Sequence, residues 1–343
     1  MSAILKNIST HFIGNKALDQ NLMTSSESVQ ADDVVAEMIT TAFLERFEKT
    51  FEQYCFTHNT SLEFNEVYNF SKDVFEGDKK LHESSVSIAE HLFEYTNHPK
   101  IKEGELHVCE FENCSFEGAF VDAIGIFKTE SKSEYLEMKP DDSNYDFYRK
   151  EGIDLKKIEK GCIIYNSNKE EGYVVYIFDN QSRSSEATYW KEDFLHLKVV
   201  ANEFHQTNEF LGITKQFIAK QIDEEFEISK TDKIDLLNKS VDYFKTHEEF
   251  TKEEFEAEVF GNEDLIESFG KFDSNYRDKN ELDELEGFEI STQAVKKQEK
   301  AFKSVLKLDK NFHIYIHGNR EMIQQGIDDD GRKFYKVYYD KEK

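Results

Sequence analysis

The chain has 343 residues, enough for about two domains and a substantial core. It carries 43 basic against 70 acidic residues, a net charge of −27, which excludes a generally cationic nucleic-acid or membrane binder. Any polyanion would have to be met by a local basic patch. The 30 Phe, 16 Tyr and single Trp argue against disorder, because they give this highly charged chain enough apolar surface to fold.

The sequence predicts a cytoplasmic protein with reduced thiols. No apolar run approaches about 18 residues, and the first residues lack the pattern of a signal peptide. The four cysteines are too few for a secreted disulfide scaffold in a chain of this length. We therefore expect no membrane segment and no disulfide framework.

The first hundred residues are predicted to be mainly helical. Apolar side chains recur at three- to five-residue steps over 31–51, which is typical of a helix with one buried face. Similar patterns predict helices over 65–75 and 80–95, the second of which ends before Pro99.

The central part, 101–183, has the pattern of an antiparallel meander. Short runs rich in Val, Ile, Phe and Tyr alternate with Gly, Asn and Asp between 105 and 179. The polar stretch 166–172 separates two such runs and predicts a hairpin loop.

Helices are predicted again from about 185 to 310. The stretch 201–290 holds 25 acidic against 10 basic residues. Solvated helix faces would explain this charge, and so would a surface that binds a basic partner. Thr251 to Glu254 matches a capping box at the start of one helix.

The last 53 residues reverse the charge balance, with 12 basic against 8 acidic residues. We expect one helix over 291–310, with Ser291 as its N-cap and Ile290 and Val295 as a hydrophobic staple. Helical spacing would place Phe302 on the buried side and five lysines on the other. These lysines are Lys296, Lys300, Lys303, Lys307 and Lys310.

The chain is predicted to close with strands over 311–317 and 332–339 that pair with each other. A short helical link over 318–326 and a turn over 328–331 would join them. Further cations lie near these strands, namely Arg320, Arg332, Lys333 and Lys336. An acidic face of the same protein or phosphate groups of nucleic acid would each account for such a basic surface.

Together these segments predict an α+β fold. It consists of N-terminal helices over 1–100, a central antiparallel sheet over 101–183 and an acidic helical part over 184–343, which ends in a basic helix and a closing β-hairpin.

Several segments resemble the bacterial nucleoid-associated protein family in its Bacteroidetes-like form. The C-terminal stretch 294–339 carries the strongest likeness, and FVDAIGIFK (120–128), GYVVYIFDN (172–180) and HFIGNK (11–16) extend it over nearly the whole chain. The resemblance implies a nucleoid location and an association with DNA, directly or through a protein partner. It supplies no catalytic motif and no cofactor.

Two chemical alternatives remain from the residues alone. Asp122 followed by Glu137 and Lys139 has the residue types of a Mg²⁺-dependent D…ExK nuclease, although such spacing is common by chance in a highly charged chain. His107, Cys109 and Cys114 have ligand types suited to zinc but lack a fourth ligand. We therefore predict no metal centre and no enzymatic activity.

The preferred hypothesis is a non-enzymatic protein that binds DNA phosphates through the nine C-terminal cations, largely without sequence specificity. If all five helix lysines engage, the log–log salt slope should be about −4 to −5. The second hypothesis is an acidic protein that reaches the nucleoid through a protein partner. The sequence is compatible with a monomer or a homodimer, and a homodimer would raise avidity for DNA.

Overall fold

The computed structural model describes residues 3–142, 144–180, 188–299, 305–308, 310–315, 322–339 and 341, without the side chains of Val305 and Lys307. Two compact units divide at residue 200, and each is described by itself. The N-terminal helices and the central strands, expected as separate parts 1–100 and 101–183, belong to the same unit. The fold is α+β, as predicted.

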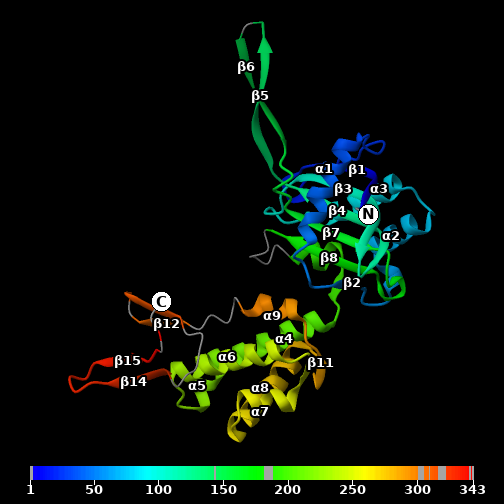
Figure 1. The fold of residues 1–343 in the computed structure, drawn as a ribbon. Coiled ribbons are helices and arrows are strands. Elements are labelled where there is room, and N and C mark those ends of the chain that lie inside the picture. The colour runs from blue at the N-terminus through cyan, green and yellow to red at the C-terminus, as the bar shows by residue number, and fades with distance from the viewer. Residues whose placement is uncertain are drawn as a thin grey trace. The chain divides into compact units, whose positions relative to one another are not determined.

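The first unit is built around a seven-stranded antiparallel sheet in the order β1-β3-β4-β7-β8-β2-β9 (Figure 1). Its strands are β1 (Ile4–Ile13), β2 (Tyr54–Phe56), β3 (Gly104–Phe116), β4 (Ala119–Thr129), β7 (Lys160–Tyr165), β8 (Val174–Asp179) and β9 (Leu197–Val199). The predicted meander and the hairpin loop at 166–172 are confirmed, since β4, β7 and β8 pair in sequence order. Strands β1 and β2 were not predicted within the mainly helical first hundred residues.

Helices cover both faces of this sheet. They are α1 (Asp33–Leu44), α2 (Glu66–Glu76) and α3 (Leu81–Glu94). Strand alternation sends Leu106 and Val108 into a cluster with α2 and α3, whereas Cys109 and Phe111 join Phe43 of α1 on the other face. Continuous apolar runs in β3, β4 and β7 follow from this burial on both faces.

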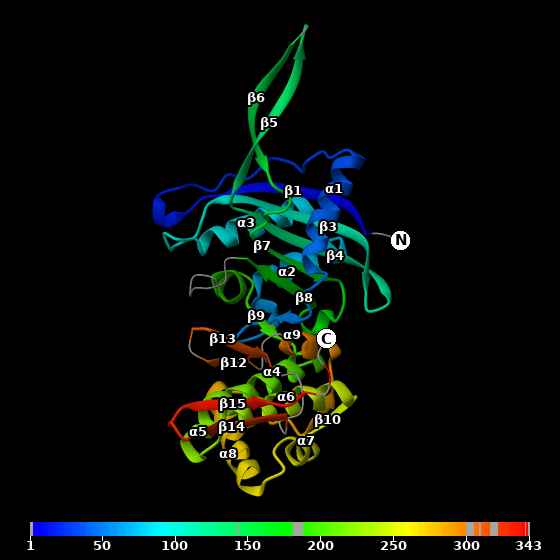
Figure 2. The same cartoon turned by 60° about the vertical axis from the view of Figure 1, so that its left-hand side comes forward.

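A separate two-stranded ribbon interrupts the meander. Its strands are β5 (Lys132–Asp141) and β6 (Asn144–Ile153), which pair only with each other. The ribbon follows β4 and extends away from the seven-stranded sheet (Figure 2). The alternating runs between 105 and 179 predicted one continuous meander and did not indicate that β5 and β6 form a ribbon of their own.

The second unit is mainly helical. It contains α4 (Glu203–Gln216), α5 (Ile222–Glu225), α6 (Lys230–Thr246), α7 (Lys252–Val259), α8 (Glu263–Asn280) and α9 (Thr292–Glu299), with the short strand pair β10 (Glu249–Thr251) and β11 (Gly287–Glu289). Its core is dominated by phenylalanines, among them Phe210, Phe217, Phe244, Phe250, Phe255 and Phe269. The described part of the chain contains no helix long and apolar enough to span a bilayer.

Two hairpins end the second unit. They pair β12 (Val305–Leu308) with β13 (Phe312–Tyr315), and β14 (Ile323–Ile327) with β15 (Lys333–Val337). The predicted pairing of 311–317 with 332–339 was therefore wrong. So was the helical link over 318–326, since its end is strand β14; residues 316–321 lie outside the described part of the chain.

Candidate functional site

The two C-terminal hairpins, β12–β13 and β14–β15, dock on helix α6 through a small apolar cluster. Ile234 of α6, Leu306 of β12 and Ile323 of β14 are buried together, and Ile314 and Tyr335 pack against them. Period-2 alternation explains this arrangement, because each strand turns one apolar side chain toward α6. The hairpins therefore have an inner side that packs on α6 and an outer side that is exposed to solvent.

The outer side of these hairpins carries cations. Lys310 lies in the turn between β12 and β13, whereas Arg332, Lys333 and Lys336 lie on and next to β15. All four side chains are exposed, and none forms an ion pair with another residue that the structure describes. We call these four residues the hairpin cations.

Lys336 lies next to the aromatic ring of Tyr338, which is hydrogen-bonded to the side-chain amide of Gln324. Its Nζ lies 4.8 Å from the ring centroid of Tyr338, within range of a cation–π contact. The hydroxyl of Tyr338 in turn donates a hydrogen bond of 3.0 Å to Oε1 of Gln324 on the neighbouring strand. The ammonium is thus placed over a ring that is itself held in position.

The turn at 328–331 is confirmed and is acidic. Oδ1 of Asp328 accepts hydrogen bonds from the backbone N–H groups of Asp330 and Arg332, and Gly331 has a φ of 80°. Three adjacent aspartates would repel phosphate at this tip. An anion would therefore approach β15 nearer to Lys336.

The cations of the helices in this unit differ, because many are neutralised. Lys239 pairs with Asp235 at 3.0 Å, and Lys245 pairs with Glu299 at 2.7 Å. Lys233 and Lys271 also pair with carboxylates. In a chain of net charge −27, the hairpins thus gather four exposed cations for which no acidic partner is described.

The predicted lysine face of a single helix over 291–310 was wrong. Helix α9 begins after Ser291, whose Oγ accepts from the N–H of Ala294, so the predicted N-cap is confirmed. The helix is described as far as Glu299, and residues 305–308 form strand β12 instead of helix. Pairing with β13 satisfies the backbone of β12 and buries Leu306, which outweighs helical periodicity.

This correction separates the predicted lysines. Lys296 is exposed on the last turn of α9, and Lys310 is exposed in a turn. Lys307 lies in β12 opposite His313, and its side chain is not described. Lys300, Lys303, Phe302 and Arg320 lie outside the described residues.

The alternative nuclease residues are not brought together. Asp122 lies in the first half of β4, whereas Glu137 and Lys139 lie halfway along the ribbon that begins after β4 ends. At about 3.3 Å per residue, the seven positions from Asp122 to Thr129 alone span roughly 23 Å. Glu137 instead faces Lys139 and Lys150, with N–O distances of 3.4 and 3.8 Å.

The alternative zinc ligands are occupied by other interactions. The two ring nitrogens of His107 lie 3.0 and 3.1 Å from the hydroxyls of Thr10 and Thr129. Burial lowers the pKa of His107 to about 4. Cys109 and Cys114 are buried free thiols, and burial raises the pKa of each. These residues act as parts of the core.

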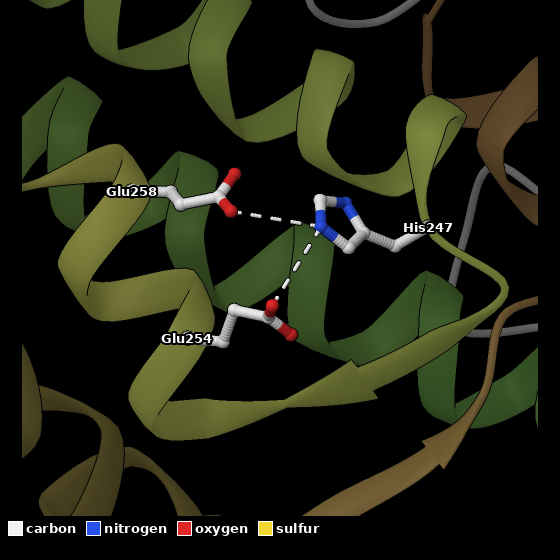
Figure 3. Close-up of side chains that lie close together, drawn as sticks. All are labelled: His247, Glu254 and Glu258. Carbon is white, nitrogen blue, oxygen red and sulfur yellow. Dashed lines mark ion pairs between the residues drawn. The ribbon is translucent and has the colours of Figure 1, made fainter.

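A different cluster of ligand-type residues lies in the second unit. His247 follows α6, and Glu254 and Glu258 lie one turn apart on α7 (Figure 3). Nε2 of His247 lies 3.9 and 3.6 Å from the nearest oxygens of Glu254 and Glu258. The ring stacks on Tyr243, and its Nδ1 lies 2.9 Å from the carbonyl oxygen of Tyr243.

This cluster has the ligand types for a divalent cation. It is the sole group of three or more His, Cys, Asp or Glu donors gathered within 4.8 Å in the described part of the chain. Both carboxylates are exposed, and exposed acidic groups often gather without a metal ion. The cluster alone therefore does not define a metal centre, and no sequence motif had pointed to it.

A set of exposed apolar residues on the ribbon was not among the predicted site residues. Tyr145 and Phe147 of β6 alternate with polar residues, and an acidic-polar stretch of sequence precedes them. This alternation, together with that stretch, is the signal that predicts a second strand. It could not show that the ribbon lies away from the sheet.

Comparison with known proteins gives one family. The model of the NA37 family, described as nucleoid-associated protein YejK, matches residues 10–343. No curated protein matches the chain. The match includes both units and extends through the two C-terminal hairpins. The chain therefore belongs to the nucleoid-associated protein family described by that model.

Proposed function

We propose that this protein associates with the nucleoid by direct, non-enzymatic contact between DNA phosphates and its C-terminal cations. The observation that carries the proposal is the absence of described acidic partners around Lys310, Arg332, Lys333 and Lys336. Unpaired cations keep their full charge for an external anion. Family membership supports the same process.

The remaining predicted cations extend this surface in the proposal. Lys296 belongs to it by exposure, and Lys300, Lys303, Lys307 and Arg320 belong to it by position in the sequence. Phosphate contacts position a protein without reading bases, so the binding is largely independent of sequence. The site of action is the cytoplasmic nucleoid.

Binding must overcome the negative charge of the rest of the chain. Interactions beyond about 8 Å are largely screened at physiological ionic strength, so a local patch can attract phosphate while distant acids repel it weakly. Lower salt strengthens the attraction of the basic patch for phosphate and also the repulsion by the distant acidic residues. Binding releases counterions from the DNA, and this release is more favourable at low salt. We therefore expect the affinity for DNA to decrease as the salt concentration increases.

The test is fluorescence anisotropy of a labelled DNA duplex over a series of salt concentrations. We expect a negative log–log slope for the wild type, and a slope smaller by about 1.8 for Lys333→Glu/Lys336→Glu. The matched control is Lys220→Glu/Lys279→Glu, which makes the same charge change at exposed positions on the helices of the same unit.

Three outcomes decide the proposal. A reduced slope in the β15 variant alone supports it. An equal loss in both variants would mean that net charge, and not the hairpins, controls binding. No binding by the wild type at low salt would contradict direct contact and favour recruitment by a protein partner.

A further inference from the structure

The β5–β6 ribbon exposes several large apolar side chains on a short segment. Each strand has ten residues, so the ribbon is about 33 Å long. It holds seven of the 24 exposed large hydrophobic residues among those the structure describes. A two-stranded ribbon with solvent on both faces has little stability of its own, so this composition calls for a partner surface.

The strand register separates the ribbon into two unlike faces. Met138 pairs with Phe147, and Pro140 pairs with Tyr145, so these four side chains share one face with Leu136. Leu136, Phe147 and Tyr145 are 68%, 66% and 64% exposed. We call these five residues the apolar ribbon face.

The opposite face is more polar. Glu137 lies between Lys139 and Lys150, and Nζ of Lys139 lies 6.0 Å from the ring centroid of Tyr148. Tyr135 and Tyr148 are exposed on this face as well, at 56% and 46%. The larger continuous group of exposed apolar side chains therefore lies on the apolar ribbon face.

We propose that the apolar ribbon face binds the same face of a second copy of this chain, forming a two-fold symmetric homodimer. A two-fold interface brings the same patch of both copies together, so a strip of apolar side chains is its own complement. If Met138 and Phe147 lie at the axis in antiparallel ribbons, Tyr145 of one copy lies over Leu136 and Arg149 of the other. Arg149 can then stack on an aromatic ring.

Charge favours this occupant over DNA. The ribbon holds six acidic and four basic residues between 132 and 153, and its apolar face carries no cation beyond Leu136 toward the tip. Phosphate would find no attractive surface there. A second copy needs only apolar contact.

The length of the ribbon also resolves the repulsion between two chains of net charge −27. Charges separated by more than about 8 Å are largely screened at physiological ionic strength. Contact centred on Met138, about 20 Å from the ribbon base at Lys132, keeps the acidic sheets of the two copies beyond that distance. An interface formed by the surfaces of the units themselves would bring their acidic residues within that distance.

The surface area that the apolar ribbon face can bury predicts a weak dimer. Five side chains of this size, about 60% exposed, offer on the order of 500 Å² per copy, or about 1,000 Å² in total. This value lies at the lower end of specific interfaces. Dissociation in the micromolar range is therefore expected, so the oligomeric state should depend on protein concentration.

Sedimentation velocity of the full chain at about 1 to 100 µM tests the proposal. We expect a concentration-dependent dimer for the wild type and a monomer for Leu136→Asp/Phe147→Asp. Tyr135→Asp/Tyr148→Asp is the matched control, because it places two acids at exposed positions on the opposite face and should still dimerise. Fluorescence of Trp190, which is buried in the first unit, checks that each variant folds.

Cross-linking tests the symmetry separately. The four native cysteines are buried, so Met138→Cys should form a disulfide-linked dimer under mild oxidation, whereas Lys150→Cys on the other face should not. A monomeric wild type at 100 µM would overturn the proposal. So would a Leu136→Asp/Phe147→Asp variant that still dimerises, or equal cross-linking from both faces.

Discussion

The ribbon β5–β6 and the C-terminal hairpins β12–β13 and β14–β15 are elements of the same kind that differ in what packs against them. The hairpins pack Leu306, Ile323 and Tyr335 against α6, and their outer side carries cations together with exposed apolar side chains. The strands of the ribbon pair only with each other, and Leu136 and Phe147 stay in solvent. Docking within a unit thus buries one side of a hairpin, whereas an undocked ribbon leaves its apolar face for another molecule.

The units that carry these surfaces both bury polar groups, and each unit has groups of its own. The first unit buries the ion pairs Lys128–Glu130 and Lys160–Asp179 and two histidines, and burial lowers the pKa of both His11 and His107 to about 4. The second unit buries a charged network, in which Arg277 contacts Asp273 at 2.8 Å and Glu209 at 2.7 Å. Burial would raise the pKa of Glu209, but hydrogen bonds from His205 and Arg277 lower it overall.

The largest effect is expected from breaking the charged network. Arg277→Met removes a positive charge that balances the buried carboxylates of Asp273 and Glu209. Loss of one member of a buried ion pair lowers the free energy of unfolding by about 3–5 kcal/mol. The loss should appear in urea unfolding followed by far-UV circular dichroism. Trp190 fluorescence, which reports the core of the first unit, should keep its midpoint.

The matched control for this change is Lys271→Met on the same helix. Lys271 pairs with Glu267 at the surface, so its replacement should alter neither signal measurably. Equal shifts of both signals in Arg277→Met would show that the two cores unfold together, contrary to the comparison.

Acid should weaken the first unit through its buried histidines. The pKa of His107 is about 4 in the folded state and near 6.5 in the unfolded state. The stabilisation that follows from this difference is therefore fully present above pH 6.5. It should be lost progressively as the pH falls from 6.5 to about 4, by up to about 3 kcal/mol. Urea unfolding followed by Trp190 fluorescence measures this dependence.

A variant separates His107 from other titrating groups. His107→Gln should reduce the dependence between pH 6.5 and 4 and leave the part that His11 contributes, whereas His98→Gln, at an exposed position, should retain the whole dependence. A wild type with constant stability over this range would contradict the assignment.

A smaller effect is expected where the hairpins dock. Leu306→Ala removes a buried side chain from the cluster on α6 and should cost about 2 kcal/mol, the lower end for such truncations, because a small cluster relaxes readily. Amide hydrogen exchange in β12–β13 should accelerate about 30-fold. Ile327→Ala, at an exposed position in β14, should leave exchange unchanged.

The smallest effect concerns a single phosphate contact. Lys336→Gln should reduce the salt slope of DNA binding by about 0.9, with a modest loss of affinity at fixed salt. Lys220→Gln on the helical part of the same unit should leave the slope as in the wild type. No change in either variant would place the DNA contact outside β15.

The sequence by itself determined the elements whose pattern is local. Helices α2 and α3 and the hairpin β7–β8 follow from periodicity and turn residues, because their signals lie within about 20 residues. The N-cap Ser291 was predicted for the same reason. Charge counting also located the basic C-terminal region.

Only the tertiary structure decided how these elements combine. Strand β1 pairs with β3 about 100 residues away, Ile8 opposite Cys109, and β12 is a strand because β13 and α6 complete it. The unpaired hairpin cations and the exposed apolar ribbon face likewise depend on what does or does not pack beside them. Periodicity describes one segment, whereas burial and pairing are properties of several segments together.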